Sequence, residues 1–326
     1  MVAALFVLSL ITYIDRAAIS SAKVPMGTEL GLSDEAMGAV FSAFALGYAL
    51  AQVPAGWLAD RFGPRLMLSI LVVLWSALTA VTGAVNSFLV LLGVRFFFGV
   101  AEAGAFPGAA RAFYNWLPVA ERGRANGIIF SGARLGAAFA FPMMALLIES
   151  WGWRASFYWL AVPGLVWGAG WWLLFRDKPR VPPEPPPPDP TGVPAPDAPS
   201  LGSILQTRGM VLAMIQYFGS NVTNFLPLSW ILPYLQREYS LSLTDAASYA
   251  ALPLILGATS QWVAGFLVDG LYKSRYRAWS RRIPSMIGFG LAAAGLLAVR
   301  EASTPGMAAL LFAIATFGAD MTISPS

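Results

Sequence analysis

Long apolar segments recur along the whole of this sequence, and they constrain its fold more than any other feature. Ten can be marked, at residues 2–22, 36–58, 66–85, 88–110, 122–148, 154–175, 209–236, 246–270, 283–300 and 305–324. Each approaches or exceeds the ~20 residues that a helix needs to cross about 30 Å of hydrocarbon. In a bilayer the backbone must satisfy its own hydrogen bonds, which favours helices. The pattern predicts an all-α polytopic membrane protein with about ten transmembrane helices, embedded in the lipid bilayer.

The composition supports this class and excludes several functions. Apolar residues make up 57% of the 326 and charged residues 12%, with a mean hydropathy of +0.63, whereas soluble domains carry about 25% charged residues. The sequence has no cysteine and no histidine, which removes thiolate nucleophiles, disulfides and the commonest general base and metal ligand. A Gly-x-Ser-x-Gly elbow is also missing. We therefore expect no enzyme, no metal and no cofactor.

The basic residues indicate an orientation in the membrane. If the N-terminus is cytoplasmic, 14 of the 21 lysines and arginines fall in inner loops and four fall in outer loops. This bias is the positive-inside signal, and it accounts for the net charge of +4 without a nucleic-acid partner. We expect a multi-pass protein of the inner membrane of a bacterium that acts as a monomer.

A proline-rich segment divides the chain. Eleven of the 22 residues in 179–200 are proline, a composition that favours extended polyproline II and cannot form a core. It is interpreted as a stiff cytoplasmic linker, with a docking site for a proline-recognising domain as the alternative. The predicted organisation is an N-terminal six-helix half at 1–178, a linker at 179–208, and a C-terminal half of four helices at 209–326.

Charged residues inside the first and fourth apolar segments point to function. A charge near the bilayer centre costs about 2.5–3.5 kcal/mol on insertion scales, so such residues usually face a partner or a water-filled path. Asp15 and Arg16 are adjacent in the first segment, and Arg95 precedes Glu102 by seven residues in the fourth. A helix places this second pair on one face, about 10.5 Å apart along the axis. The cations could hold an anion and the carboxylates could carry protons, or all four could only join helices.

A short motif occurs twice. Gly56 and Asp60 stand at the end of the second segment, and Gly265 and Asp269 stand at the end of the eighth, 209 residues later in each case. This spacing indicates two parallel six-helix repeats.

The first copy, Gly56-x-Leu-Ala-Asp60-Arg61-x-Gly63-x-Arg65, resembles the loop signature of the major facilitator superfamily. Three further strings resemble its anion:cation symporter branch, which includes bacterial sugar-acid (hexuronate and galactonate) permeases and animal vesicular glutamate and sialic acid carriers. They are Tyr13-x-Asp15-Arg16, Arg95-Phe-Phe-Phe-Gly-Val-Ala-Glu102-Ala-Gly-Ala-Phe-Pro107 and Phe225-x-x-x-Ser229-Trp230-x-x-Pro233-Tyr234-Leu235. Facilitators normally have twelve helices, so the second repeat is expected to be incomplete and the chain truncated after its tenth helix.

The resemblance implies a proton-coupled symporter that carries an organic anion into the cell by alternating access. Arg16 and Arg95 are the expected ligands of the substrate carboxylate, because a guanidinium can hold it bidentately. Asp15 and Glu102 are the expected proton carriers. Weaker candidates for substrate contact are Tyr13, Arg134, Asn221 and Asn224, for which joining helices is the alternative.

The loop motif is interpreted as an inner gate, or conformational latch. Its expected members are Gly56, Asp60, Arg61, Gly63, Arg65 and Arg111, with Asp60 paired to Arg111. Two other functions remain open at this point. A proton-coupled drug or solute antiporter shares the fold and the loop motif, although it does not require two arginines in its cavity. A non-transporting sensor built on the same fold is the second.

Overall fold

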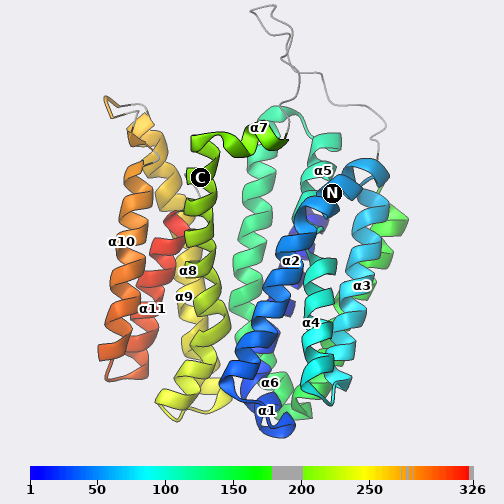
Figure 1. Cartoon of the computed structure of the whole chain (residues 1–326), viewed down its shortest axis with the longest axis vertical. Helices are drawn as coiled ribbons and strands as arrows, with labels where there is room; N and C mark the ends of the chain where they lie inside the picture. Colours follow the sequence, from blue (N-terminus) through cyan, green and yellow to red (C-terminus); the bar gives the residue numbers. More distant parts are fainter. Residues whose placement is uncertain (178–200, 273, 277–278, 281, 323–326) are drawn as a thin grey trace, which may run out of the picture. The chain divides into compact units, whose positions relative to one another are not determined.

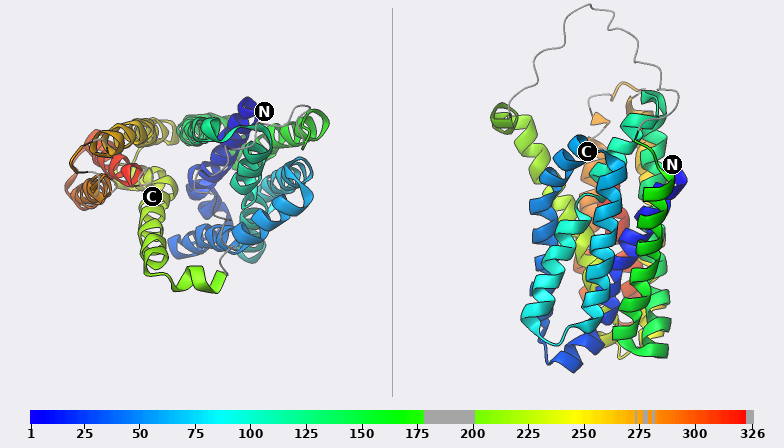
Figure 2. Two further views of the ribbon diagram at one scale, coloured as in Figure 1. Left: turned by 90° about the horizontal axis from the view of Figure 1, so that it is seen from above. Right: turned by 90° about the vertical axis from the view of Figure 1, so that its right-hand side faces the viewer.

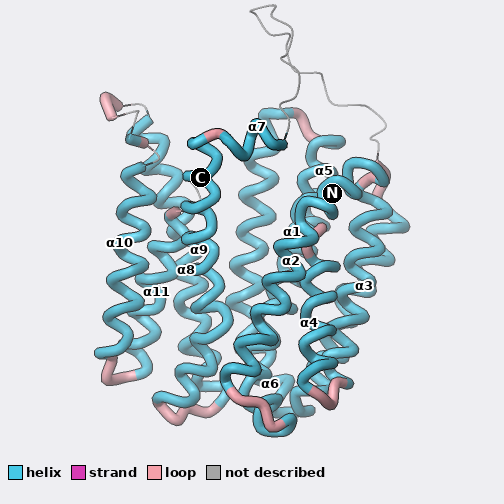
Figure 3. The backbone as a smooth tube through the Cα atoms, viewed as in Figure 1, coloured by secondary structure: helices cyan, strands magenta, loops and turns pink. Residues whose placement is uncertain are grey.

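The structure is a computed structural model that describes residues 1–177, 201–272, 274–276, 279–280 and 282–322. Every regular element in these residues is a helix (Figure 3). The chain forms two compact units, which are described separately below. The first comprises Met1–Pro185 and Leu232–Ala251, and the second comprises Pro186–Ile231 and Leu252–Ser326.

Six helices make up most of the first unit and run alongside one another (Figures 1 and 2). They are α1 (Val2–Leu30), α2 (Asp34–Phe62), α3 (Pro64–Ala84), α4 (Phe88–Glu102), α5 (Ala105–Trp116) and α6 (Val119–Leu174). Helices α1 and α3 pack along α6, and α2 packs along α4. A shared apolar core, with Met26, Met37, Leu91 and Phe157 among its buried members, joins α1, α2, α4 and α6.

Local chemistry sets the ends of these helices. Ser33 caps α2, because its hydroxyl accepts a hydrogen bond from the backbone N–H of Ala36 at 3.2 Å. Gly31 ends α1 with a left-handed φ of 65°, and Gly63 ends α2 with a φ of 81°. The predicted segment 2–22 is therefore too short, since α1 continues through Pro25 to Leu30.

The helices differ from the predicted segments at two places. The segment 88–110 was expected to be one helix, but the helix breaks between Glu102 and Ala105. Pro107 lacks the N–H that would bond to the carbonyl of Ala103 in a continuous helix, which accounts for the break. Conversely, α6 spans the two predicted segments 122–148 and 154–175, and Gly152 separates them with a non-helical φ of 76°.

The second unit contains the remaining helices. They are α7 (Leu201–Gln206), α8 (Arg208–Glu238) up to Ile231, α9 (Leu243–Tyr272) from Leu252, α10 (Arg282–Ala298), the short 3₁₀ helix η2 (Val299–Glu301) and α11 (Pro305–Met321). Helices α10 and α11 pack closely, since a Cβ on Gly318 would meet the carbonyl oxygen of Gly288 at 2.4 Å. Of the predicted linker 179–208, residues up to 200 lie outside the described residues, and the six residues of α7 are helical; the linker stays a prediction.

Within the described residues, six helical stretches are long and apolar enough to cross a membrane. They are Val2–Leu30, Asp34–Phe62, Pro64–Ala84, Phe88–Trp116, Ala125–Leu174 and Arg282–Glu301. Leu243–Gly257 and Pro305–Met321 are shorter apolar helices. The expectation of a polytopic helical membrane protein is confirmed, whereas a total of ten spans and an incomplete second repeat stay predictions.

Helices α2 and α4 touch through their backbones at two glycines. A Cβ on Gly99 would lie 2.2 Å from the carbonyl oxygen of Phe44, and one on Gly47 would lie 2.2 Å from that of Phe96. Such distances leave no room for a methyl group on either helix. The spacing of α2 and α4 therefore depends on these two residues, as in other membrane bundles with small residues at helix contacts.

We expect Gly99→Ala to force α2 away from α4 and to destabilise the protein by about 1–3 kcal/mol, the usual range for overpacking. Thermal unfolding of the purified protein in detergent measures this loss. Gly93→Ala is the matched control, because it lies on the same helix and a Cβ there meets no atom within 4 Å. Equal melting temperatures for the two variants would contradict the close contact.

Candidate functional site

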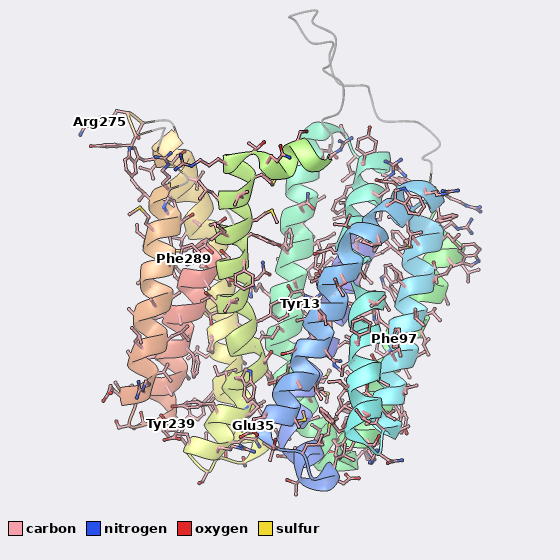
Figure 4. The ribbon with its side chains drawn as sticks, viewed as in Figure 1. Tyr13, Glu35, Phe97, Tyr239, Arg275 and Phe289 are labelled. Atoms are coloured by element: carbon pink, nitrogen blue, oxygen red, sulfur yellow. The ribbon has the colours of Figure 1, made fainter. Side chains whose placement is uncertain are left out.

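Arg16 and Glu102 form a buried ion pair that links α1 to α4. The Nε of Arg16 donates to Oε2 of Glu102 at 2.6 Å, and the two side chains are 4% and 0% exposed. Arg16 lies near the middle of α1, one turn from Tyr13, which Figure 4 labels. Glu102 is the last residue of α4. A charge-assisted hydrogen bond of this length is among the stronger polar contacts in proteins.

Three aromatic rings surround the guanidinium of Arg16. Its Cζ lies 4.9 Å from the ring centre of Tyr13, 4.6 Å from that of Tyr48 and 5.4 Å from that of Phe44. These distances are typical of cation–π contacts, which strengthen when water is excluded. Phe44 and Tyr48 lie on α2 and are missed by the sequence reasoning. Their spacing of four residues, on one helix face, is the signal that could have indicated a shared role.

Arg95 lies next to this pair. Its side chain is buried, with Cζ 4.5 Å from the ring centre of Phe98 and 5.1 Å from that of Phe44. It interacts electrostatically with Glu102 and with Asp15. Phe44 thus contacts both guanidinium groups. The structure brings Arg16, Arg95 and Glu102 together, two cations around one carboxylate.

Several polar atoms in this cluster have no hydrogen-bond partner among the described residues. They are Nη2 of Arg16, Nε of Arg95 and Oε1 of Glu102. Buried polar groups in proteins nearly always have a partner, which can be protein, water or ligand. The cluster retains the capacity to donate two further hydrogen bonds from arginine, which is what an additional anion requires.

Asp15 lies on a different side of α1. It lines a cavity of about 110 Å³ together with apolar side chains of α1 and α6, namely Ile11, Ile14, Met143, Leu147, Trp159, Leu160 and Pro163. Neither carboxylate oxygen has a hydrogen-bond partner in the described part of the chain, although the indole of Trp75 is adjacent. Successive residues on a helix point about 100° apart. Asp15 therefore borders an apolar chamber while Arg16 faces α2 and α4.

The weaker candidates have different surroundings. Arg134 is buried on α6, between Gly132 and Gly136, at which a Cβ would collide with backbone atoms of Phe6 and Leu10 on α1. In the second unit, Nδ2 of Asn221 donates to the carbonyl of Tyr217 on its own helix at 2.8 Å. The side chain of Asn224 lies outside the described residues.

Among the residues expected to form the latch, Asp60 and Arg111 lie close together, whereas Arg61 contacts a tryptophan. Nη1 of Arg111 lies 3.4 Å from Oδ1 of Asp60, and both side chains are partly exposed. Gly56 faces α5, because a Cβ there would contact Pro107 at 3.7 Å. The guanidinium of Arg61 lies over Trp57 instead, at 5.2 Å from the ring centre.

Arg65 contacts the end of α6. Its Nε and Nη2 donate to the carbonyl of Trp172 at 2.8 and 2.6 Å, in the last turn of α6. Its backbone N–H donates to Oδ1 of Asp177 at 2.8 Å. Gly63 leaves room for that carboxylate, since a Cβ there would lie 2.8 Å from it. Arg65 thus holds the end of α6 against the start of α3, where the last carbonyls of a helix attract cations.

Comparison with known proteins identifies the family to which the chain belongs. The profile of the Major Facilitator Superfamily matches residues 5–326. The chain is 34% identical over 321 residues to the "Probable L-galactonate transporter" of Escherichia coli, covering 96% of this chain and 71% of the relative. It is 37% identical over 272 residues to the "Probable sulfoacetate transporter" of Cupriavidus necator, covering 81% and 63%.

A third relative is the "Probable galactarate/D-glucarate transporter" of Escherichia coli, 31% identical over 340 residues and covering 96% of this chain and 76% of the relative. The chain spans 63% to 76% of the length of these three relatives. Among solved structures, a bacterial homolog of the human lysosomal transporter Spinster, inward-facing and occupied, matches with a TM-score of 0.78 and 25% identity. It covers 99% of this chain and 72% of that one.

The fold agrees with a second, more distant structure, the D-xylose-proton symporter, with a TM-score of 0.68 and 15% identity. All of these proteins are transporters, not enzymes. Since the family profile extends over almost the whole chain and the described helices adopt the same fold, this chain belongs to the major facilitator superfamily.

Proposed function

We propose that this chain is a secondary active transporter that carries an organic anion, a sugar acid or another carboxylate, together with protons into a bacterial cell. The observation that carries the proposal is the buried Arg16–Glu102 pair within an aromatic cage beside Arg95. The protein acts as a monomer in the cytoplasmic membrane with its N-terminus inside. Its two parallel repeats alternate access to the site, and the second contributes four helices in this chain.

The chemistry of the relatives' substrates supports an anion. Galactonate, galactarate and glucarate are carboxylates, and sulfoacetate carries a sulfonate as well. Two buried arginines in one cluster suit such groups, because a planar guanidinium can donate two parallel hydrogen bonds to a carboxylate. A drug antiporter for cationic or neutral lipophilic compounds would place those compounds against two desolvated cations, which is unfavourable.

Coupling follows from competition for Arg16. Without substrate, Glu102 is the carboxylate that neutralises Arg16. A substrate carboxylate that takes the guanidinium displaces Glu102, which then stays buried with one cation fewer to stabilise its charge. Uptake of a proton removes that charge. Anion binding and protonation thus favour each other, and the mutual effect is the same in both directions by linkage.

Asp15 is proposed as a second proton site. It borders the apolar chamber between α1 and α6 and has no hydrogen-bond partner in the described residues. An ionised carboxylate is costly in such surroundings. Tyr13, Arg134, Asn221 and Asn224 remain proposed contacts for the rest of the substrate.

Glu102→Gln is expected to uncouple transport from protons, because the amide mimics the neutral acid and cannot release a proton inside. The full-length variant in proteoliposomes should still exchange labelled substrate in counterflow, but lose accumulation driven by an inward pH gradient. Glu35→Gln, at an exposed position of α2, is the matched control and should behave as wild type. A thermal unfolding curve checks that the variant is folded. Accumulation at the wild-type level would exclude Glu102 and leave Asp15 as the proton carrier.

Arg95→Lys should weaken substrate binding and leave the pH response intact. The charge remains, but the planar fork that holds a carboxylate is lost. Losing one charge-assisted hydrogen bond costs about 1.5–3 kcal/mol, or roughly a 10- to 100-fold rise in the apparent dissociation constant. Substrate titration at two external pH values measures both properties. Unchanged affinity would show that Arg95 joins helices and does not contact the anion.

Asp60→Ala is expected to slow exchange between the two access states, because it removes the contact with Arg111 at the inner end of α2. Asp60→Glu should also impair it, because the contact joins side chains on two helices, α2 and α5, and a longer side chain shifts the carboxylate relative to Arg111. Initial rates of counterflow in proteoliposomes measure the exchange, with Glu121→Ala, at an exposed position of α6, as the control. A normal rate for Asp60→Ala would refute the latch.

A further inference from the structure

Lys23 is an unusual residue for the place it occupies. It lies on α1, and its side chain is 3% exposed. Lysine is almost never fully buried unless it is paired. Its Nζ lies 2.5 Å from Oδ1 of Asp34, the first residue of α2. This pair joins two consecutive helices of the N-terminal half and fixes the position of the Asp34 carboxylate.

The second oxygen of the same carboxylate accepts a hydrogen bond from Nη1 of Arg237. Arg237 lies in the last turn of α8, 203 residues further along the chain, in the segment Leu232–Ala251 that belongs to the first unit. A second contact holds the same segment, since Oγ1 of Thr244 donates to Oε1 of Glu149 on α6 at 2.7 Å. Figure 4 shows this end of the helices, where Glu35 and Tyr239 are labelled.

The two cations that contact Asp34 differ in their exposure to solvent. Lys23 is buried, whereas Arg237 and Asp34 are 56% and 42% exposed. Breaking the contact with Lys23 is costly, because it would leave a buried cation without its partner. An exposed pair contributes only about 0–1 kcal/mol, since water replaces the lost contact. The Asp34–Arg237 contact can therefore open repeatedly at small cost while Lys23 keeps Asp34 in place.

A small cavity beside the three residues has room for water that replaces the contact when it opens. It measures about 120 Å³, and its lining includes Lys23, Thr28, Asp34 and Arg237. Its lining is polar, and the volume suffices for several water molecules. This space adds to the solvent that already reaches the exposed side chains of Arg237 and Asp34.

We propose that the Asp34–Arg237 ion pair is a releasable clamp of the outer gate, with Lys23 as the residue that positions it. The proposal rests on the proposed function, because a gate is meaningful only in a protein that alternates access. In the topology predicted above, Lys23, Asp34 and Arg237 lie at the outer end of the helices. The clamp holds this end shut by joining α1 and α2 to the end of α8. It opens when Arg237 leaves Asp34 for water.

Cross-linking of introduced cysteines tests the clamp without any substrate. The full-length protein, with any other cysteine replaced, carries Glu149→Cys and Thr244→Cys as reporters, since these exposed positions touch in the closed end. A short bifunctional thiol reagent in proteoliposomes then reports closure. Adding Arg237→Gln should lower the initial cross-linking rate roughly twofold to fivefold, the range for an exposed ion pair. Arg237→Lys should restore most of it.

Two controls make the result decisive. Glu29→Gln removes the ion pair with Arg154, which joins α1 to α6 without involving the segment 232–251, and should leave cross-linking unchanged. High salt should slow cross-linking in the parent and not in Arg237→Gln, because salt screens exposed charges. An unchanged rate in Arg237→Gln overturns the clamp. Because the readout needs no substrate, that outcome leaves anion transport standing, and failure of anion transport leaves the cross-linking result interpretable.

Discussion

The buried contact between Arg16 and Glu102 connects two groups of tightly packed helices. Helices α1 and α6 approach through Gly132 and Gly136, and α2 and α4 approach through Gly47 and Gly99. These backbone contacts leave no room for the helices of each group to move closer together. The ion pair runs from α1 to α4 and so joins one group to the other. Removing one partner of a buried pair typically costs 3–5 kcal/mol, so the pair is a structural joint as well as a candidate binding group.

This double role explains how a local chemical event can act on the helices. Any group that competes for the Arg16 guanidinium also removes the bond between the two packed groups. The aromatic rings of Tyr13, Phe44 and Tyr48 keep the cation in place meanwhile, because their contacts do not depend on Glu102. The Arg16–Glu102 contact is thus both a candidate substrate site and a link between helices. A transporter needs such a link if substrate binding is to change the arrangement of its helices.

Sequence reasoning could find the charged residues of the site but not their partners. Arg16, Arg95 and Glu102 are conspicuous because charges are costly in apolar helices. Phe44 and Tyr48 are not, since aromatic side chains are common in such helices. The helix break before Pro107 was predictable from proline chemistry and was overlooked. The guanidinium of Arg65 donates to a backbone carbonyl. A sequence does not show which backbone carbonyls are available, so this contact could not be predicted. Asp34 and Arg237 are too far apart in the chain for any local pattern to pair them.

Asp15 and Arg16 point about 100° apart on α1, and this difference in direction has a consequence for the surroundings of each charge. One side of the helix borders an apolar chamber against α6, and the other borders charged and aromatic groups against α2 and α4. Two consecutive residues of one helix therefore have different surroundings: a small apolar cavity at Asp15, and a carboxylate with aromatic rings at Arg16. Asp15 nevertheless interacts electrostatically with Arg95 and Glu102, so a change of charge in the cluster around Arg16 is felt by the carboxylate that borders the apolar cavity.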